Sequence, residues 1–124
     1  MRHLTLALVL LTASLPSFSK DWNCRNKDLQ VQCDPTGCEA TKDFTPVSVS
    51  VSQKGRIEIC AYSGCWEGSG KVTRTRHHTL VSTTTLRWKG VSANPADFII
   101  AIDARDRVGF IKGGGFAMPL QCEP

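Results

Sequence analysis

The sequence predicts an all-β fold: a small antiparallel meander that closes into a barrel or a sandwich and is stapled by three disulfides. Three observations predict it: short runs in which apolar and polar residues alternate, turn-forming residues between these runs, and six cysteines. No segment after residue 20 has a helical period of apolar residues. We expect about eight short strands in mostly consecutive hairpins, and the sequence leaves barrel and sandwich open.

The first 19 residues have the form of a cleaved export signal. A short basic start, Met1-Arg2-His3, precedes an apolar run at residues 4–15, and Ser17 and Ser19 supply the small residues that a signal peptidase requires. The apolar run is shorter than the ~20 residues of a membrane span, so we expect no membrane insertion after cleavage. Residues 20–124 should then form a single domain.

The charge of this domain is mild. Loss of Arg2 lowers the number of Lys and Arg residues from 15 to 14 against 11 acidic residues, which leaves a net charge of +3. A nucleic-acid-binding domain usually concentrates more positive charge than this on one face. We therefore expect no nucleic-acid partner, and we expect a monomer.

The first half of the domain is predicted to form hairpins. Residues 29–33 alternate between apolar and polar, and Asp-Pro-Thr-Gly at 34–37 forms a turn. Valine and serine alternate over residues 47–52, so the valines should face the core and the serines the solvent. Residues 53–55 then turn the chain into an alternating strand at 56–60.

The second half continues in the same way. Residues 71–89 are rich in Thr and Val, as strands are, and residues 77–79 are expected to bend this stretch into two strands. The run Phe-Ile-Ile-Ala-Ile at 98–102 is apolar on both faces, which predicts the centre of the sheet. A turn at 103–106 is expected to lead into a strand at 107–111, and a turn at 113–115 into a strand at 116–118.

The strand and turn pattern predicts the pairing of the six cysteines, which are Cys24, Cys33, Cys38, Cys60, Cys65 and Cys122. Cys33 and Cys38 flank a four-residue turn, as do Cys60 and Cys65, so each pair should lie opposite across a hairpin, within disulfide range. By elimination Cys24 pairs with Cys122. Spacing alone allows 15 pairings, and the main alternative crosses the two halves, as Cys24–Cys38 or Cys33–Cys60. Disulfides in an exported chain indicate a periplasmic or secreted protein.

No set of residues is singled out as a catalytic or metal site. His77 and His78 are adjacent, so their side chains should diverge, and two such imidazoles do not make a zinc site. A serine hydrolase could combine Ser63, one of these histidines and Asp97 or Asp103, but the sequence has no Gly-x-Ser-x-Gly motif. We expect no enzyme activity, no metal and no cofactor, with a small hydrolase that uses His77 or His78 as the alternative.

Two stretches could instead bind a partner. Residues 60–70 place Tyr62 on a disulfide-closed turn with Trp66 just beyond, and rigid aromatic side chains lose little entropy on binding. Alternatively, both aromatic rings cover one end of the core. In a strand, Arg74, Arg76 and His78 would share one face, and this basic stripe could meet an acidic partner or an anionic glycan. The alternative is a charged edge strand that resists aggregation.

An export signal, disulfides and a small antiparallel barrel together resemble the bacterial periplasmic inhibitors of c-type lysozyme. In that family a loop with Ser-Gly and a loop with Lys-Gly enter the lysozyme cleft, and the nearest dipeptides here are Ser69-Gly70 and Lys89-Gly90. The tyrosines of the family motifs are missing here, and six cysteines exceed that family's usual number. No site residue is therefore carried over from the resemblance.

Together these observations predict an exported binding module of the cell envelope that acts through a loop surface on a protein or a glycan. Inhibition of a hydrolase such as a lysozyme is the most specific form of this hypothesis. The small hydrolase is one alternative. A structural or stress-related envelope protein without a specific ligand is the other.

Overall fold

The computed structural model describes residues 21–90, 94–113 and 115–124, and within them it contains eleven strands and no helix. The described residues thus include no helix that could cross a membrane. The predicted signal peptide lies outside them. The strands are β1 (Trp22–Asn26), β2 (Gln30–Asp34), β3 (Gly37–Thr41), β4 (Val47–Val51), β5 (Arg56–Ala61), β6 (Gly64–Arg74), β7 (His78–Thr83), β8 (Arg87–Gly90), β9 (Phe98–Asp103), β10 (Val108–Gly113) and β11 (Phe116–Glu123).

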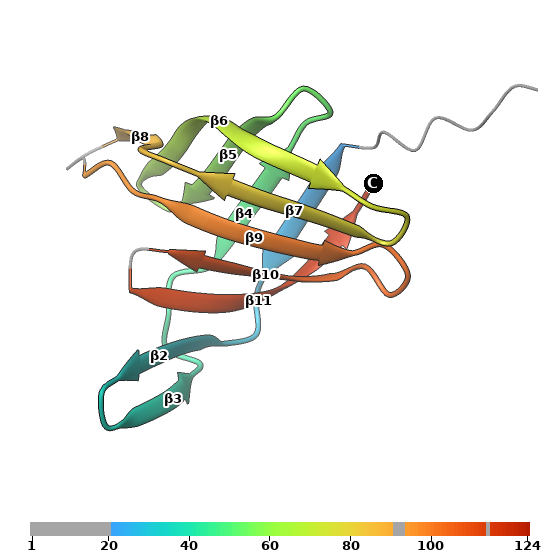
Figure 1. Ribbon diagram of the computed structural model, residues 1–124. Helices are drawn as coiled ribbons and strands as arrows, with labels where there is room; N and C mark the ends of the chain where they lie inside the picture. The colour runs from blue at the N-terminus through green and yellow to red at the C-terminus, as the bar shows by residue number, and fades with distance from the viewer. Residues whose placement is uncertain (1–20, 91–93, 114) are drawn as a thin grey trace, which may run out of the picture.

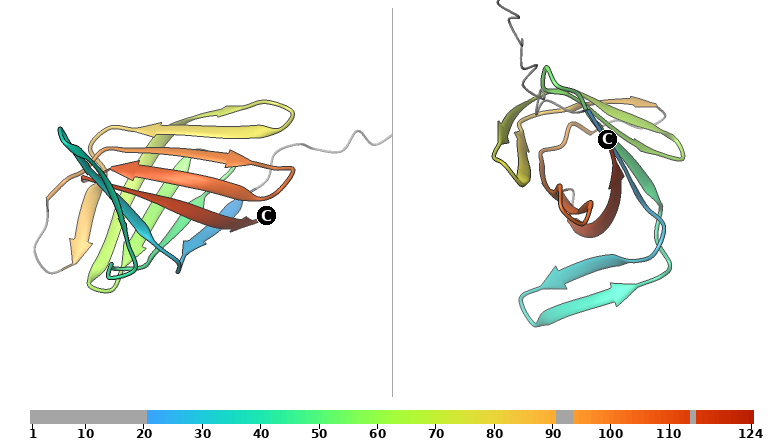
Figure 2. Two further views of the ribbon diagram at one scale, coloured as in Figure 1. Left: turned by 90° about the horizontal axis from the view of Figure 1, so that it is seen from below. Right: turned by 90° about the vertical axis from the view of Figure 1, so that its right-hand side faces the viewer.

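Eight of these strands form a closed antiparallel barrel (Figure 1). Their order is β1, β4, β5, β6, β7, β9, β10 and β11, and β11 returns to pair with β1. Seen from the end, these strands make a ring (Figure 2, right). The all-β prediction is confirmed, and of the two architectures left open the chain adopts the barrel.

Side chains fill the interior of the barrel. Successive residues of a strand point to opposite faces, so every second residue of β1 and β4 is buried, and the valines of β4 face inwards as predicted. A barrel of about eight strands encloses a space that side chains can fill. The buried apolar residues are Trp22, Cys24, Val47, Val49, Val51, Ile57, Ile59, Val81, Leu86, Phe98, Ile100, Ile102, Ile111, Met118, Leu120 and Cys122.

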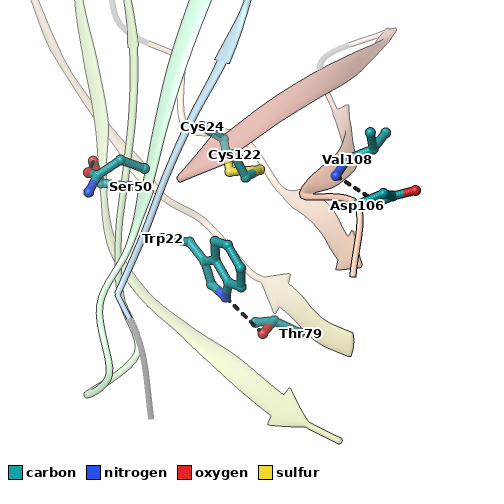
Figure 3. Close-up of a disulfide and its surroundings, with 8 residues drawn as sticks. Trp22, Cys24, Ser50, Thr79, Asp106, Val108 and Cys122 are labelled. Carbon is teal, nitrogen blue, oxygen red and sulfur yellow. Dashed lines mark hydrogen bonds between the residues drawn. A yellow bond between two sulfur atoms is a disulfide. The ribbon is translucent and has the colours of Figure 1, made fainter. Parts of the chain in front are cut away.

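A disulfide in this core joins the two ends of the domain. Cys24 of β1 and Cys122 of β11 are bonded, and both are almost fully buried. Beside them the indole Nε1 of Trp22 donates a hydrogen bond to Thr79 Oγ1 on β7 over 3.1 Å (Figure 3). A buried indole N–H needs such a partner, and this one links two strands that are not neighbours in the sheet.

The other two disulfides also follow the predicted scheme. Cys33 is bonded to Cys38 and Cys60 to Cys65, each pair directly opposite across its hairpin. The crossed alternative is therefore wrong. The scheme follows from local hairpins, because two residues that flank a tight turn are already close before the rest of the chain folds.

A hairpin that we call the arm, made of β2, β3 and their turn, extends away from the barrel (Figures 1 and 2). It is inserted between β1 and β4, and its pairing with the barrel joins Val31 to Ala117 of β11. Most of its residues are exposed. In its turn, Asp34 Oδ1 accepts hydrogen bonds from the amide groups of Thr36 and Gly37 over 2.7 and 3.1 Å. This side chain and the Cys33–Cys38 bond fix the shape of the turn.

Some details of the predicted strands need correction. β9 was predicted at the centre of the sheet because it is apolar on both faces. It buries Phe98, Ile100 and Ile102 on one face only, and Ile99 on the other face is 62% exposed. The reason is that a closed barrel buries one face of each strand and turns the other to the solvent. The turn between β6 and β7 lies at 75–77 rather than 77–79, and β1 and β8 were not predicted.

Candidate binding surface

Tyr62 lies in the turn between β5 and β6, and its side chain is 84% exposed. Cys60 and Cys65 face each other at the ends of the two strands, and their disulfide closes the turn. The disulfide restricts the backbone of the turn, so the backbone that carries the ring has little conformational freedom left to lose on binding.

Tyr62 borders a shallow depression of about 270 Å³ on the outside of the barrel. Pro46, which precedes β4, contributes an apolar wall, and Arg25 and Lys27 contribute two cations. We call Tyr62, Pro46, Arg25 and Lys27 the Tyr62 surface. An aromatic ring and an arginine beside an apolar hollow are the residue types that contribute most to protein–protein contacts.

Arg25 and Lys27 also line a second depression, of about 420 Å³, along β1 and β11. This one is polar, and Asp106 and Arg107 of the turn between β9 and β10 lie at its other side. The carboxylate of Asp106 accepts a hydrogen bond from the amide of Val108 over 2.9 Å (Figure 3). The two cations therefore lie between an apolar and a polar hollow.

Sequence reasoning identified Tyr62 but missed Arg25, Lys27 and Pro46. These residues lie near Tyr62 because β4 pairs with β1 on one side and with β5 on the other. The predicted bond between Cys24 and Cys122 tied the two ends of the domain together but predicted no strand at β1. No local signal gave β4 as its other neighbour, because the arm separates the two strands in the sequence.

Trp66, the other aromatic residue predicted in this loop, packs towards the core. Its ring centroid lies 4.4 Å from that of Trp88 and 5.3 Å from that of Phe98. Its indole Nε1 donates to the carbonyl oxygen of Asn94 over 3.1 Å. Trp66 therefore covers the core, as the alternative interpretation of this loop predicts. Tyr62 is exposed to the solvent, as the binding interpretation requires.

The predicted basic residues lie at the other end of the barrel. β6 runs from Gly64 to Arg74, so the strand alone separates Tyr62 from Arg74 by roughly 30 Å. Arg74 ends β6, Arg76 lies in the turn and His78 begins β7, so these three residues do not share one face of a strand as predicted. The reason is the position of the turn at 75–77, which the sequence placed two residues later.

At this far end His78 meets an acidic side chain. Its Nε2 lies 3.5 Å from Asp103 Oδ2, and Arg105 Nη2 lies 2.6 Å from the same oxygen. The pKa of Asp103 is held well below its usual range, first by the side-chain hydrogen bond from Arg105 and then by the Arg105 amide, with a smaller contribution from the charge of His78. Ser63 lies at the Tyr62 end, so the triad considered from the sequence is not assembled.

The charged side chains on the outside of β5, β6 and β8 form ion pairs. Glu67 lies 2.6 Å from Lys89 Nζ and 3.8 Å from Arg56 Nη2, and the hydrogen bond from Lys89 lowers the pKa of Glu67. Next to them, ligand-type atoms of Glu58, Cys60 and Cys65 lie within 4.8 Å of one another. The two sulfur atoms are bonded to each other, so they are not thiolate ligands for a metal.

The two dipeptides on which the resemblance to lysozyme inhibitors depended do not lie in loops. Ser69 and Gly70 lie within β6, where they pair with β5 and β7. Lys89 and Gly90 belong to β8 and pair with β6. A strand that is paired in this way does not project as a loop does, so these dipeptides do not support the resemblance.

Comparison of the chain with protein-family models, with curated proteins and with solved structures found no match. The candidate surface is therefore argued from its own residues.

Proposed function

We propose that this chain is an extracytoplasmic binding module that contacts a protein or glycan of the cell envelope through the Tyr62 surface. One observation carries the proposal: Tyr62 is 84% exposed on a disulfide-closed turn, beside a hollow that Arg25 and Lys27 also line. The three disulfides are consistent with the oxidising compartment in which such a partner would be met.

The chemistry of the surface defines the partner. A tyrosine ring has two side-chain torsions, so it covers a large contact area at a small entropic cost. Arg25 and Lys27 offer only hydrogen-bond donors and positive charge, which favour carboxylate or other anionic acceptors. We therefore infer a partner whose contact region combines an apolar or aromatic patch with acidic groups.

Inhibition of a hydrolase such as a lysozyme is the most specific form of this proposal. A rigid, projecting turn is suited to a concave partner, such as the active-site cleft of an enzyme. Glycoside hydrolases carry a pair of carboxyl groups in that cleft, and Arg25 and Lys27 could pair with them. The role of the Tyr62 turn in this form is to block the entry of substrate.

The test compares wild-type protein with a Tyr62→Ala/Arg25→Ala variant. Wild type should inhibit a c-type lysozyme, or capture a defined protein or glycan from an envelope extract, and the variant should do so at least about tenfold more weakly. Lys54→Ala is the matched control, because Lys54 is an exposed cation in the turn between β4 and β5. Trp66 is left unchanged because it packs against the core. Equal activity of wild type and variant would remove the Tyr62 surface from the function.

The hydrolase alternative is favoured by one contact, that between His78 and Asp103. A carboxylate beside an imidazole can orient the ring for general acid–base catalysis. A His77→Ala/His78→Ala variant should then lose turnover of ester, phosphodiester or peptidoglycan substrates. If wild type turns over none of them, this alternative fails, whatever the outcome for Tyr62.

A further inference from the structure

The outside of the barrel carries a continuous apolar patch. Of the five large hydrophobic side chains that are exposed in the described part of the chain, four lie on the adjacent strands β7, β9 and β10. They are Leu80 (47% exposed), Ile99 (62%), Val108 (41%) and Phe110 (58%). A single exposed hydrophobic residue needs no explanation, but a group on neighbouring strands indicates a contact surface.

The strand register places these residues side by side. Leu80 lies opposite Ala101, Ala101 opposite Phe110, and Phe110 opposite Pro119, so one apolar row crosses four strands. On the same outward face, Ile99 lies two residues from Ala101 on one side of this row, and Val108 lies two residues from Phe110 on the other side. We call these six residues the outer apolar face. The face is uncovered in the folded chain, as the exposed fractions of Ile99 and Phe110 show.

One side of the outer apolar face is positively charged. The register aligns Lys71, Ser82, Ile99 and Lys112 across β6, β7, β9 and β10. The row that contains Ile99 therefore has one exposed lysine at each end. At the opposite side of the face, Asp103 is already paired with Arg105 and His78. The face therefore fits an occupant that is apolar and negatively charged.

The arm of this chain has that composition. Between Gln30 and Thr41 it contains Asp34 and Glu39 and no Lys or Arg, so its charge is −2. Its apolar side chains are Val31, Pro35 and Ala40, beside an exposed disulfide. A two-stranded hairpin is at best marginally stable by itself in water, and it gains stability when it packs against a further layer.

We propose that two copies of this chain associate so that the arm of each copy packs on the outer apolar face of the other. The dimer has two-fold symmetry. Its two arm-to-face contacts are identical, so the assembly is complete with two copies. The arm strands are roughly 17 Å long and the face is about 14 Å across its four strands, so one arm can cover one face. Glu39 of each arm then faces the row of the other copy that runs from Lys71 to Lys112.

This inference is independent of the proposed function, because Tyr62 and Arg25 belong to neither the arm nor the outer apolar face. It departs from the monomer that the sequence predicts.

Analytical ultracentrifugation of the chain from residue 20 onwards tests the proposal, combined with a charge exchange. Wild type should be a dimer in concentrated solution. Glu39→Lys should weaken dimerisation about tenfold or more, and Lys71→Glu/Lys112→Glu should weaken it similarly, because like charges then meet. The triple variant should restore dimerisation, since each arm again meets a face of opposite charge. Lys54→Glu, away from both surfaces, should leave the dimer unchanged.

A second variant tests the apolar contact. Phe110→Ser removes the largest exposed ring of the face without affecting the core, so it should give a folded monomer by circular dichroism and sedimentation. A wild-type chain that stays monomeric at about 1 mM would overturn the proposal, because even a millimolar Kd would populate dimers there. A dimer that is insensitive to the charge variants would overturn it as well, since another surface would then form the contact.

Discussion

The barrel and the arm contain the same local device in two different settings. Cys60–Cys65 in the barrel and Cys33–Cys38 in the arm each close a four-residue turn between antiparallel strands, with an identical sequence separation of five. On both sides of the barrel turn, inward residues such as Ile59 and Trp66 pack against the core. The arm strands have no comparable buried residue.

This difference separates what a hairpin needs in order to form from what it needs in order to be stable. A turn with suitable residues and a disulfide brings two strands together in both places. Closure of the sheet then buries one face of each barrel strand, and this burial provides most of the folding free energy. The arm lacks it, so we expect the arm and the barrel to respond differently to the same chemical change.

The largest expected effect is the loss of the disulfide between Cys24 and Cys122. It joins two residues 98 positions apart in the sequence, so a Cys24→Ala/Cys122→Ala variant should lose about 4 to 5 kcal/mol of unfolding free energy. Urea denaturation, followed by tryptophan fluorescence, measures this change. A loss below about 1 kcal/mol would mean that the core holds the ends together without the bond.

The next effect contrasts an apolar residue of the barrel with one of the arm. Ile57 is fully buried, so Ile57→Ala should cost about 3 kcal/mol through lost burial and a cavity. Val31 of the arm is half-buried, and Val31→Ala should cost under about 0.5 kcal/mol in the same denaturation experiment. Similar losses at both sites would show that the arm unfolds together with the barrel.

The two turn disulfides provide the most direct comparison. On the chain-entropy model a six-residue loop contributes about 2 kcal/mol, so a Cys60→Ala/Cys65→Ala variant should lower the global unfolding free energy by that amount. A Cys33→Ala/Cys38→Ala variant should change it by less than about 0.5 kcal/mol and should speed amide exchange in the arm alone. Equal global losses would contradict the distinction between the two regions.

The smallest expected effect concerns pH. The pKa values of Asp103 in the barrel and Asp34 in the arm lie below their ordinary value of 3.8, chiefly because Arg105 and Thr36 respectively donate side-chain hydrogen bonds to them. A carboxyl with a lowered pKa in the folded state stabilises the fold above about pH 4, and this stabilisation is lost as the pH falls through the folded-state value.

Asp103→Asn should therefore lower the global stability at pH 7, and its difference from wild type should shrink as the pH falls below about 4. Asp34→Asn should leave the midpoint of global unfolding unchanged. It should increase amide exchange at Thr36 and Gly37, because their N–H groups donate hydrogen bonds to Asp34. Denaturation at a series of pH values and hydrogen exchange measure the two outcomes. A pH-independent effect of Asp103→Asn would exclude the titration of this carboxylate as the cause.

Much of the fold and part of the site were predictable from the sequence. The valines of residues 47–51 alternate with serines, so this strand follows from a local pattern. The two cysteines on either side of a tight turn bond to each other, so two of the disulfides follow from local patterns as well. Tyr62 was predictable because it lies within such a turn. Arg25 and Lys27 were not, because they approach Tyr62 through β4, a strand that the arm separates from β1 in the sequence.

The sequence by itself determined the all-β class, the hairpins and the two turn disulfides, because these depend on side-chain alternation and on turns a few residues long. The bond between Cys24 and Cys122 followed from these two only by elimination. Only the tertiary structure decided that the sheet closes into a barrel, that Ile99 and Phe110 face the solvent, and that the arm extends away from the barrel. The physical reason is that burial depends on which strands become neighbours, and long-range pairing places residues together that no local pattern relates.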